Sequence, residues 1–340
     1  MKKNYFAIVT ASLLVGCLLS PARVFSQRPT GYKILNKFRI NSPGGWDYIS
    51  VDPLQHKIYA SHGDQINVLD EKTGDSIGVI KDVPGTHGVA IVNSLNKGYV
   101  SHGKGSCTSF DLKTNAVISN INVGVGPDYI LYDSFSNKIF VFNGRGFDIS
   151  VIDPKNDQVV SKVVVGERLE SAVSDGNGNI YVNGVTNNEI VQFNSVSLKI
   201  LHRYKIVGGK GPTGLDMDRK NRVLFIGCGD NNKMIIMNAD NGKVLGSFPI
   251  GDCDAVVFDP QLKLAFASNK EGYITIVKES NPVKFSYVEK LKTLVGARTI
   301  AIDTTNHHLY LPTAVSPWVD DPKTRPAALP NTFCILDMGK

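Results

Sequence analysis

Histidines are the residues of this chain whose types and spacing most directly suggest chemistry. The tripeptide Ser-His-Gly occurs at 61–63 and again at 101–103, and His87 lies between the two. Imidazole nitrogens are common ligands of zinc and copper, so His62, His87 and His102 from adjacent loops could form a metal site. The alternative is that repeat duplication copied one loop histidine. We favour duplication, because the chain lacks a dedicated Cys/His zinc motif.

A second set of polar residues recurs about every 40 positions, each at the start of an apolar run. The set comprises Asp47, His87, Asp128, Glu170, Thr213, Asp254 and Arg298. Carboxylates and imidazoles can act as bases or ligands, and Arg298 carries a planar donor fork suited to a carboxylate or phosphate. If these residues lie close together in the fold, they predict a binding site whose favoured ligand is an anionic metabolite.

The elements that position these residues are short strands. Between 128 and 166 the chain reads YILYD, IFVF, ISVID and VVSKVVVG, separated by turns rich in Gly, Asn and Asp. Such runs predict a four-stranded antiparallel meander. Seven such units at a period near 40 predict an all-β fold, a seven-bladed β-propeller forming one domain over 27–340.

The two ends of the chain predict how the ring closes. The unit that follows Arg298 supplies three strands within 298–338, whereas an unassigned strand precedes the first unit at 31–41. Pairing that N-terminal strand with the C-terminal blade would complete the seventh sheet and remove an exposed edge.

In a propeller, the loops between blades and those between the second and third strands emerge on one face. That face should therefore gather the recurring polar residues, Trp46, and the loop residues His62, His102, Asn143, Arg145, Asn183, Cys228 and Asn269. The long segment 313–331 carries Trp318 to the same face. Such a polar ring can simply hydrate the channel and cap strand ends. For the whole set we favour a site for a small molecule or a protein partner.

Several of the repeats carry a family signature. The runs IYASHG (58–63), GYVSHG (98–103), ISVID (149–153) and IYVNG (180–184) resemble the YVTN-repeat, YncE-like family of bacterial seven-bladed propellers. This resemblance covers nearly everything after the N-terminal segment and implies the propeller fold. The family includes secreted and periplasmic binding proteins. We consider nucleic-acid binding only because this resemblance implies it.

Two alternatives to a binding protein stay open. The first is a lactonase-like hydrolase, because the wider relatives of the family include lactonase-type propellers. Glu170, His87 and Arg298 are residue types that could act as base and oxyanion partners, although no catalytic motif is present. The second is a metal-binding or redox accessory protein, through the three histidines.

The N-terminal residues 1–26 predict a signal peptide. A basic start at Lys2 and Lys3 precedes an apolar run over 5–19, too short for a membrane span. A rival interpretation is a lipobox ending at Cys17, which would anchor the protein to lipid. Either way we expect a periplasmic or secreted protein, as a monomer. The chain has a net charge of +6 but no run of five or more basic residues. Its charge therefore gives no argument for nucleic-acid binding.

Two cysteines could form a disulfide. Cys228 is expected in the second-to-third strand loop of the fifth blade and Cys253 in the loop entering the sixth, on the same face. An exported protein meets an oxidising environment that permits the bond. Two unpaired loop thiols are the equally favoured alternative.

Overall fold

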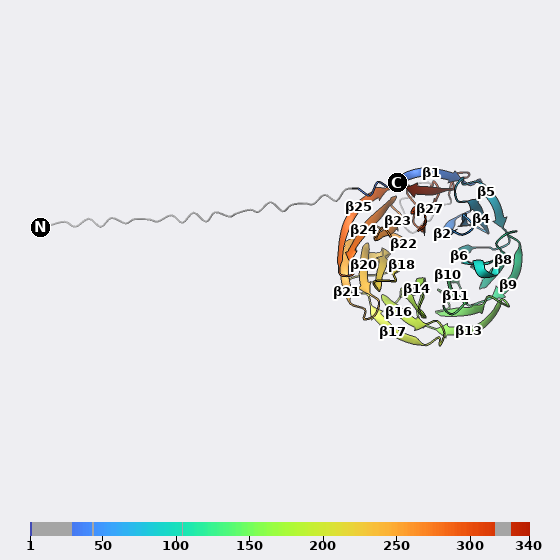
Figure 1. The fold of residues 1–340 in the computed structure, drawn as a ribbon, viewed down its shortest axis with the longest axis horizontal. Coiled ribbons are helices and arrows are strands. Elements are labelled where there is room, and N and C mark those ends of the chain that lie inside the picture. Colours follow the sequence, from blue (N-terminus) through green and yellow to red (C-terminus); the bar gives the residue numbers. More distant parts are fainter. Residues whose placement is uncertain (2–28, 43, 104, 317–327) are drawn as a thin grey trace.

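The chain forms a ring of seven four-stranded antiparallel sheets around a central axis (Figure 1). The computed structural model describes residues 1, 29–42, 44–103, 105–316 and 328–340. The predicted all-β, seven-bladed propeller is confirmed. The proposed signal peptide, Cys17 and Trp318 lie outside the described residues.

Within each of the first six blades the strands follow the chain from the axis outward, so the first strand lines the channel. Blade 1 comprises β2 (Trp46–Asp52), β3 (Lys57–His62), β4 (Gln65–Asp70) and β5 (Ser76–Ile80). Blade 2 comprises β6 (Thr86–Val92), β7 (Lys97–His102), β8 (Ser106–Asp111) and β9 (Val117–Asn122). Blade 3 comprises β10 (Pro127–Asp133), β11 (Lys138–Asn143), β12 (Asp148–Asp153) and β13 (Gln158–Val164).

The next three blades repeat this order. Blade 4 comprises β14 (Leu169–Ser174), β15 (Asn179–Gly184), β16 (Glu189–Asn194) and β17 (Ile200–Lys205). Blade 5 comprises β18 (Pro212–Asp218), β19 (Val223–Cys228), β20 (Lys233–Asn238) and β21 (Val244–Pro249). Blade 6 comprises β22 (Cys253–Asp259), β23 (Leu264–Asn269), β24 (Tyr273–Asn281) and β25 (Lys284–Lys292). Two short 3-10 helices, η1 (Asn93–Leu95) and η2 (Gly229–Asn231), lie in connections of blades 2 and 5.

Blade 7 is built from both ends of the chain, as predicted. Its strands are β26 (Ala301–Asp303), β27 (His308–Thr313), β28 (Cys334–Gly339) and β1 (Lys33–Arg39). The outer strand β1 pairs antiparallel with β28, from Lys33 opposite Gly339 to Arg39 opposite Cys334. Pairing the first strand with the last gives blade 7 its fourth strand and closes the ring.

Stacking of blade on blade explains why the middle strands are buried on both faces. The second strand of each blade carries an aromatic residue that is at most 1% exposed: Tyr59, Tyr99, Phe140, Tyr181, Phe225, Phe266 and Tyr310. Burying such a ring contributes roughly 2–3 kcal/mol. Three tyrosines of this layer, Tyr99, Tyr181 and Tyr310, also bond a neighbouring blade, as Tyr310 does by donating to Glu71 at 3.1 Å. The recurring aromatics therefore hold adjacent blades together.

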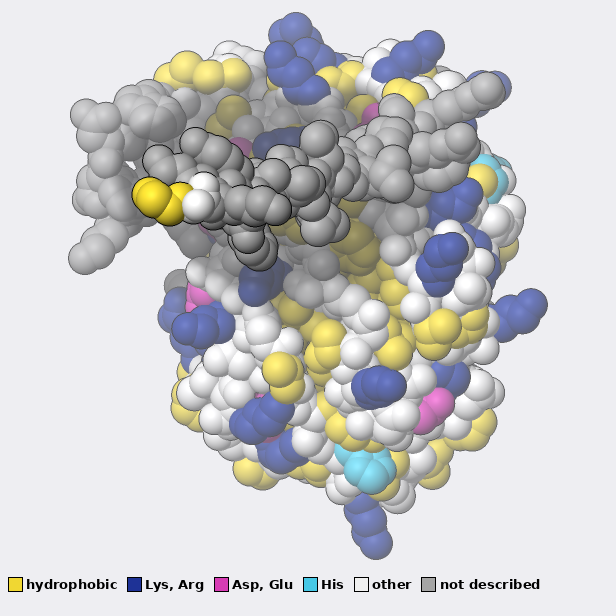
Figure 2. All heavy atoms as spheres, turned by 90° about the vertical axis from the view of Figure 1, so that its left-hand side faces the viewer, with side chains coloured by type: hydrophobic (Ala, Val, Ile, Leu, Met, Phe, Trp, Pro, Cys, Tyr) yellow, Lys and Arg dark blue, Asp and Glu magenta, His cyan; other side chains and the backbone are white. Residues whose placement is uncertain are grey.

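One side of the molecule carries many basic side chains (Figure 2). On the face drawn in Figure 2, Lys and Arg side chains are interspersed with scattered hydrophobic ones, and acidic side chains are few. Exposed apolar residues of blade 6 include Val283, at the turn into β25, and Tyr287, within β25. Among the described residues, no helix is long and apolar enough to cross a membrane.

Candidate functional site

The recurring polar residues come together at one mouth of the central channel. In blades 1 to 6 each lies at a register shift between the first two strands, such as the one between Trp46 and Ile49. A β-bulge re-aims a side chain, and here it turns the opening residue towards the axis. Arg298 lies three residues before β26. We call this set the mouth ring: Asp47, His87, Asp128, Glu170, Thr213, Asp254 and Arg298.

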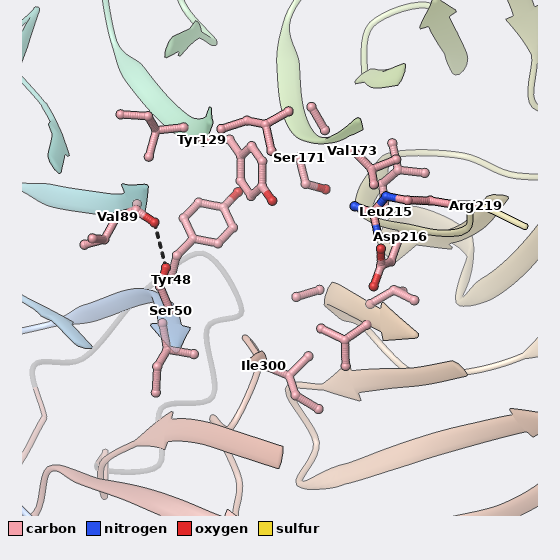
Figure 3. Close-up of a pocket in the computed structure, with 18 residues that line it drawn as sticks. Tyr48, Ser50, Val89, Tyr129, Ser171, Val173, Leu215, Asp216, Arg219 and Ile300 are labelled. Carbon is pink, nitrogen blue, oxygen red and sulfur yellow. Dashed lines mark hydrogen bonds between the residues drawn. The ribbon is translucent and has the colours of Figure 1, made fainter. Parts of the chain in front are cut away.

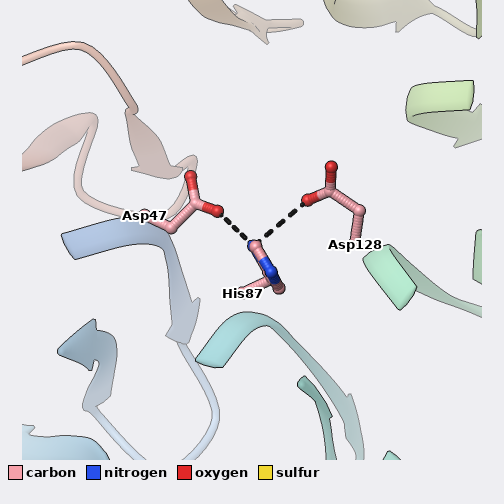
Figure 4. Close-up of side chains that lie close together, drawn as sticks. All are labelled: Asp47, His87 and Asp128. Atoms are coloured by element: carbon pink, nitrogen blue, oxygen red, sulfur yellow. Dashed lines mark hydrogen bonds and ion pairs between the residues drawn. The ribbon is translucent and has the colours of Figure 1, made fainter. Parts of the chain in front are cut away.

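His87 bridges two aspartates of the mouth ring (Figure 4). Its Nδ1 lies 2.6 Å from Asp47 Oδ2 and 3.4 Å from Asp128 Oδ1. Burial works to lower the pKa of His87, but the hydrogen bond to Asp47 and the charges of Asp128, Asp47 and Glu170 outweigh it and raise that pKa. The imidazolium form is therefore favoured beside these carboxylates.

Arg298 is already neutralised by acidic neighbours. Its Nε lies 3.0 Å from Asp254 Oδ2, and its terminal nitrogen lies 3.7 Å from Asp47 Oδ1. The same nitrogen donates to the Trp46 carbonyl at 2.7 Å. The guanidinium thus joins blades 7, 1 and 6, and two carboxylates offset its positive charge. The structure gives no support to the expectation of an anionic guest on Arg298 alone.

The mouth ring holds more negative than positive charge. Burial, and then the nearby charge of Asp128, raise the pKa of Glu170 to about 8, although Arg168 pairs with its Oε1. Burial and the charge of Asp47 raise the pKa of Asp128 to about 6, and the pKa of Asp254 is raised chiefly by burial. Buried carboxylates that repel each other hold their protons more tightly. The ring is therefore suited to groups that donate hydrogen bonds or carry positive charge.

A cavity of about 200 Å³ lies in the channel beneath the mouth ring (Figure 3). Tyr48 and Tyr129 line it with their rings in an edge-to-face contact, 5.3 Å between centroids. The Tyr48 hydroxyl lies 3.5 Å from Glu170 Oε2, which connects the cavity to the ring. At the cavity's other side lie Asp216, which accepts from the Phe258 amide at 2.7 Å, and Arg219.

The sequence interpretation did not identify these four cavity residues. Tyr48 and Tyr129 directly follow a mouth-ring residue, and strict alternation would turn them away from the channel. The bulge breaks this alternation, so both residues line the channel. Asp216 interrupts the apolar first strand of blade 5, and this was the one signal available in the sequence.

The second-strand residues predicted for the site are instead buried strand ends. His62, His102, Asn143, Asn183 and Asn269 lie at or next to the last position of their strands and are at most 5% exposed. Their polar atoms bond to their own or the neighbouring blade. Asn143, for example, donates to Asp148 at 2.7 Å and to Ser150 at 3.0 Å. The structure therefore places these residues as buried strand ends and not in exposed loops at the mouth.

The three-histidine metal site is also not formed. His62 hydrogen-bonds Ser42 at 2.7 Å and Gly44 at 2.9 Å, and its ring stacks on Phe333 at 3.8 Å. His102 contacts Thr108 at 3.0 Å. Burial lowers the pKa of both. Within the described ranges, the one cluster with metal-ligand spacing is instead Asp47, His87 and Asp128.

The other predicted site residues divide between structure and surface. Trp46 is half-buried and donates to the Gly296 carbonyl at 3.3 Å, so it packs between blades 1 and 7 beside Arg298. Thr213 donates to the Cys253 carbonyl at 2.6 Å, and Arg145 is exposed.

Of the two alternatives for Cys228 and Cys253, the structure shows unpaired thiols, and both are buried. Cys228 ends β19 and Cys253 begins β22, so neither occupies the exposed loop that was expected. The Cys253 thiol donates to the Ala255 carbonyl at 3.3 Å. Burial raises the pKa of both thiols.

The fold and this channel define the chain as a seven-bladed β-propeller with a polar mouth above an aromatic cavity. It is similar to a solved chain of Kuenenia stuttgartiensis hydrazine synthase, with a TM-score of 0.69 at 14% identity over 82% of this chain and 95% of that one. At that identity the similarity shows the fold. No family model and no curated sequence matches the chain.

Proposed function

We propose that the protein is an exported binding protein that takes a small molecule at the channel mouth. The observation that carries this proposal is the cavity lined by the rings of Tyr48 and Tyr129, which lies beneath the carboxylates of the mouth ring and contacts Glu170 through the Tyr48 hydroxyl. A concave site with aromatic walls and a few converging polar groups is typical of small-molecule sites. Its volume of about 200 Å³ is below the roughly 300–1,000 Å³ of drug-sized sites.

The charge of the ring defines the chemistry of the guest. Four carboxylates, from Asp47, Asp128, Glu170 and Asp254, face the cations of Arg298 and Arg168 and the titratable His87. A ligand that directs amine or hydroxyl donors towards the mouth ring and packs an apolar part against Tyr48 and Tyr129 complements this arrangement. A free carboxylate or phosphate does not.

The test is a thermal-shift screen of small amines, amino acids and polyols, followed by affinity measurements on the hits. Tyr129→Leu removes the aromatic ring but keeps apolar bulk, and we expect it to weaken binding at least tenfold, or about 1.4 kcal/mol. Tyr287→Leu, on the outer strand β25, is the matched control and should bind as the parent does. Hits that bind Tyr129→Leu as tightly as the parent would refute this placement.

One observation favours a hydrolase as the second candidate. The 2.6 Å bond between His87 Nδ1 and Asp47 orients the imidazole as a histidine–carboxylate base pair does. Once His87 has lost a proton, its neutral imidazole could take a proton from water at the other ring nitrogen, and that water would attack a lactone or ester substrate. Hydrolysis of a lactone panel by the parent, lost in His87→Gln, would support this activity, whereas equal rates in both would exclude it.

A further inference from the structure

We infer that Asp47, His87 and Asp128 form a site for a divalent transition-metal ion. The three side chains come from the first strands of consecutive blades, β2, β6 and β10. Their candidate ligand atoms all lie within 4.8 Å of one another. Figure 4 shows both carboxylates directed at the same imidazole nitrogen.

The distances suit a coordination sphere. Around an ion with bonds of about 2.1 Å, neighbouring ligand atoms are about 3.0–3.4 Å apart. The His87 nitrogen lies 2.6 Å from Asp47 Oδ2 and 3.4 Å from Asp128 Oδ1, and all three ligand atoms lie within 4.8 Å of one another, so the side chains would have to adjust around an ion. A metal would replace the proton that Nδ1 shares with Asp47, and binding would release that proton.

The neighbours leave these three atoms available. Asp47 presents its other oxygen, Oδ1, to Arg298 at 3.7 Å, so the contact of Oδ2 is the one with His87 that an ion would replace. Among the described residues, the ion pair with His87 is the one close polar contact of the Asp128 carboxylate. One imidazole with two carboxylates favours zinc, manganese or iron over the all-oxygen sites that calcium and magnesium prefer.

Electrostatics points the same way. The groups that surround the three ligands are the acids Glu170 and Asp254 and the bases Arg298, Arg168 and His102. Asp47 and Asp128 place two carboxylates around one imidazole nitrogen, and a divalent ion bound there would offset their negative charge. Three protein ligands leave coordination positions open to water or to an oxygen of the guest. The inference therefore rests on the mouth ring of the proposed function, but it does not depend on the guest.

Titration calorimetry of Zn²⁺ into the metal-stripped full chain tests the site without any guest. We expect one tight site in the parent and at least about tenfold weaker binding in both Asp128→Asn and His87→Gln. The matched control is Asp230→Asn, an exposed aspartate of η2 on the same face, which should bind as the parent does. Circular dichroism melts identify any variant that fails to fold. Asp128→Glu keeps a carboxylate at this position, so it should bind Zn²⁺ more tightly than Asp128→Asn does.

Each contrary outcome has a distinct meaning. No stoichiometric Zn²⁺ site in the parent, or undiminished binding in His87→Gln through surface histidines such as His56, would overturn the inference. A preference for Ca²⁺ over Zn²⁺ and Mn²⁺ would overturn the choice of a transition metal. If Zn²⁺ does not bind while screening hits still depend on Tyr129, the metal site fails and the proposed binding function stands.

Discussion

Replacing Glu170 with glutamine should make the propeller more stable at alkaline pH. Glu170 is buried, with its side chain 10% exposed, and its pKa is raised from 4.5 to about 8 by burial and by the charge of Asp128. Below 4.5 the carboxyl is protonated in both folded and unfolded chains. As the pH rises towards 8 the unfolded chain loses its proton first, so the free energy of unfolding falls.

The size of this effect follows from the two pKa values. The difference between the unfolded pKa of 4.5 and the folded pKa of about 8 lowers the free energy of unfolding by about 5 kcal/mol at pH values above about 8. We therefore expect the free energy of unfolding of Glu170→Gln, measured in urea relative to that of the parent, to increase by about 4 kcal/mol between about pH 5 and about pH 9.

A second buried glutamate provides a control of opposite sign. Burial favours a higher pKa for Glu189, but hydrogen bonds from Lys205, Glu167 and Arg203 outweigh it, so that pKa is lowered. Its ionised form stabilises the fold above the unfolded pKa, so Glu189→Gln should be less stable than the parent at about pH 9 and converge with it in acid. Parallel pH profiles for the parent and Glu170→Gln would refute the electrostatic account of the mouth ring.

Three further outcomes are expected. Deleting residues 31–41 removes the outer strand of blade 7 and buried Tyr32, Phe38 and Ile40, and calorimetry should show Tm lower by about 10 °C or more; an unchanged Tm would contradict the closure. Without reductant, a thiol reagent should leave Cys228 and Cys253 unlabelled in the native chain and label both after denaturation, whereas protection of both in denaturant would reveal a disulfide. Because the pKa of His87 is raised in the fold, the stability lost in His87→Gln should be greatest in mild acid and vanish as pH rises through that pKa; a loss that is constant with pH would contradict this.

The fold could be predicted because the repeat imposes it. Each blade carries a buried second-strand aromatic, such as Tyr59 or Phe140, that needs a neighbour to cover it. A period near 40 with four strands per unit admits few other architectures. The pairing of β1 with β28 followed from counting strands at the two ends.

The site was predicted only in part, because one-residue differences in backbone register decide which side chains face the channel. The mouth ring was found because its members recur at one position. Tyr48 and Tyr129 were missed because the bulge that turns them inwards leaves no mark in the sequence. His62 and Asn143 were assigned to loops, whereas the ladder extends by one further pair to include them as buried strand ends.

A crystal structure of the protein purified from its own cells would test the central claim most directly. The account predicts electron density for a bound small molecule in the channel mouth, with polar atoms towards Asp128 and Glu170 and its apolar part against Tyr48 and Tyr129. Anomalous scattering from the same crystal would locate any metal beside His87. A ligand held at another surface, with the mouth filled by water alone, would contradict the claim.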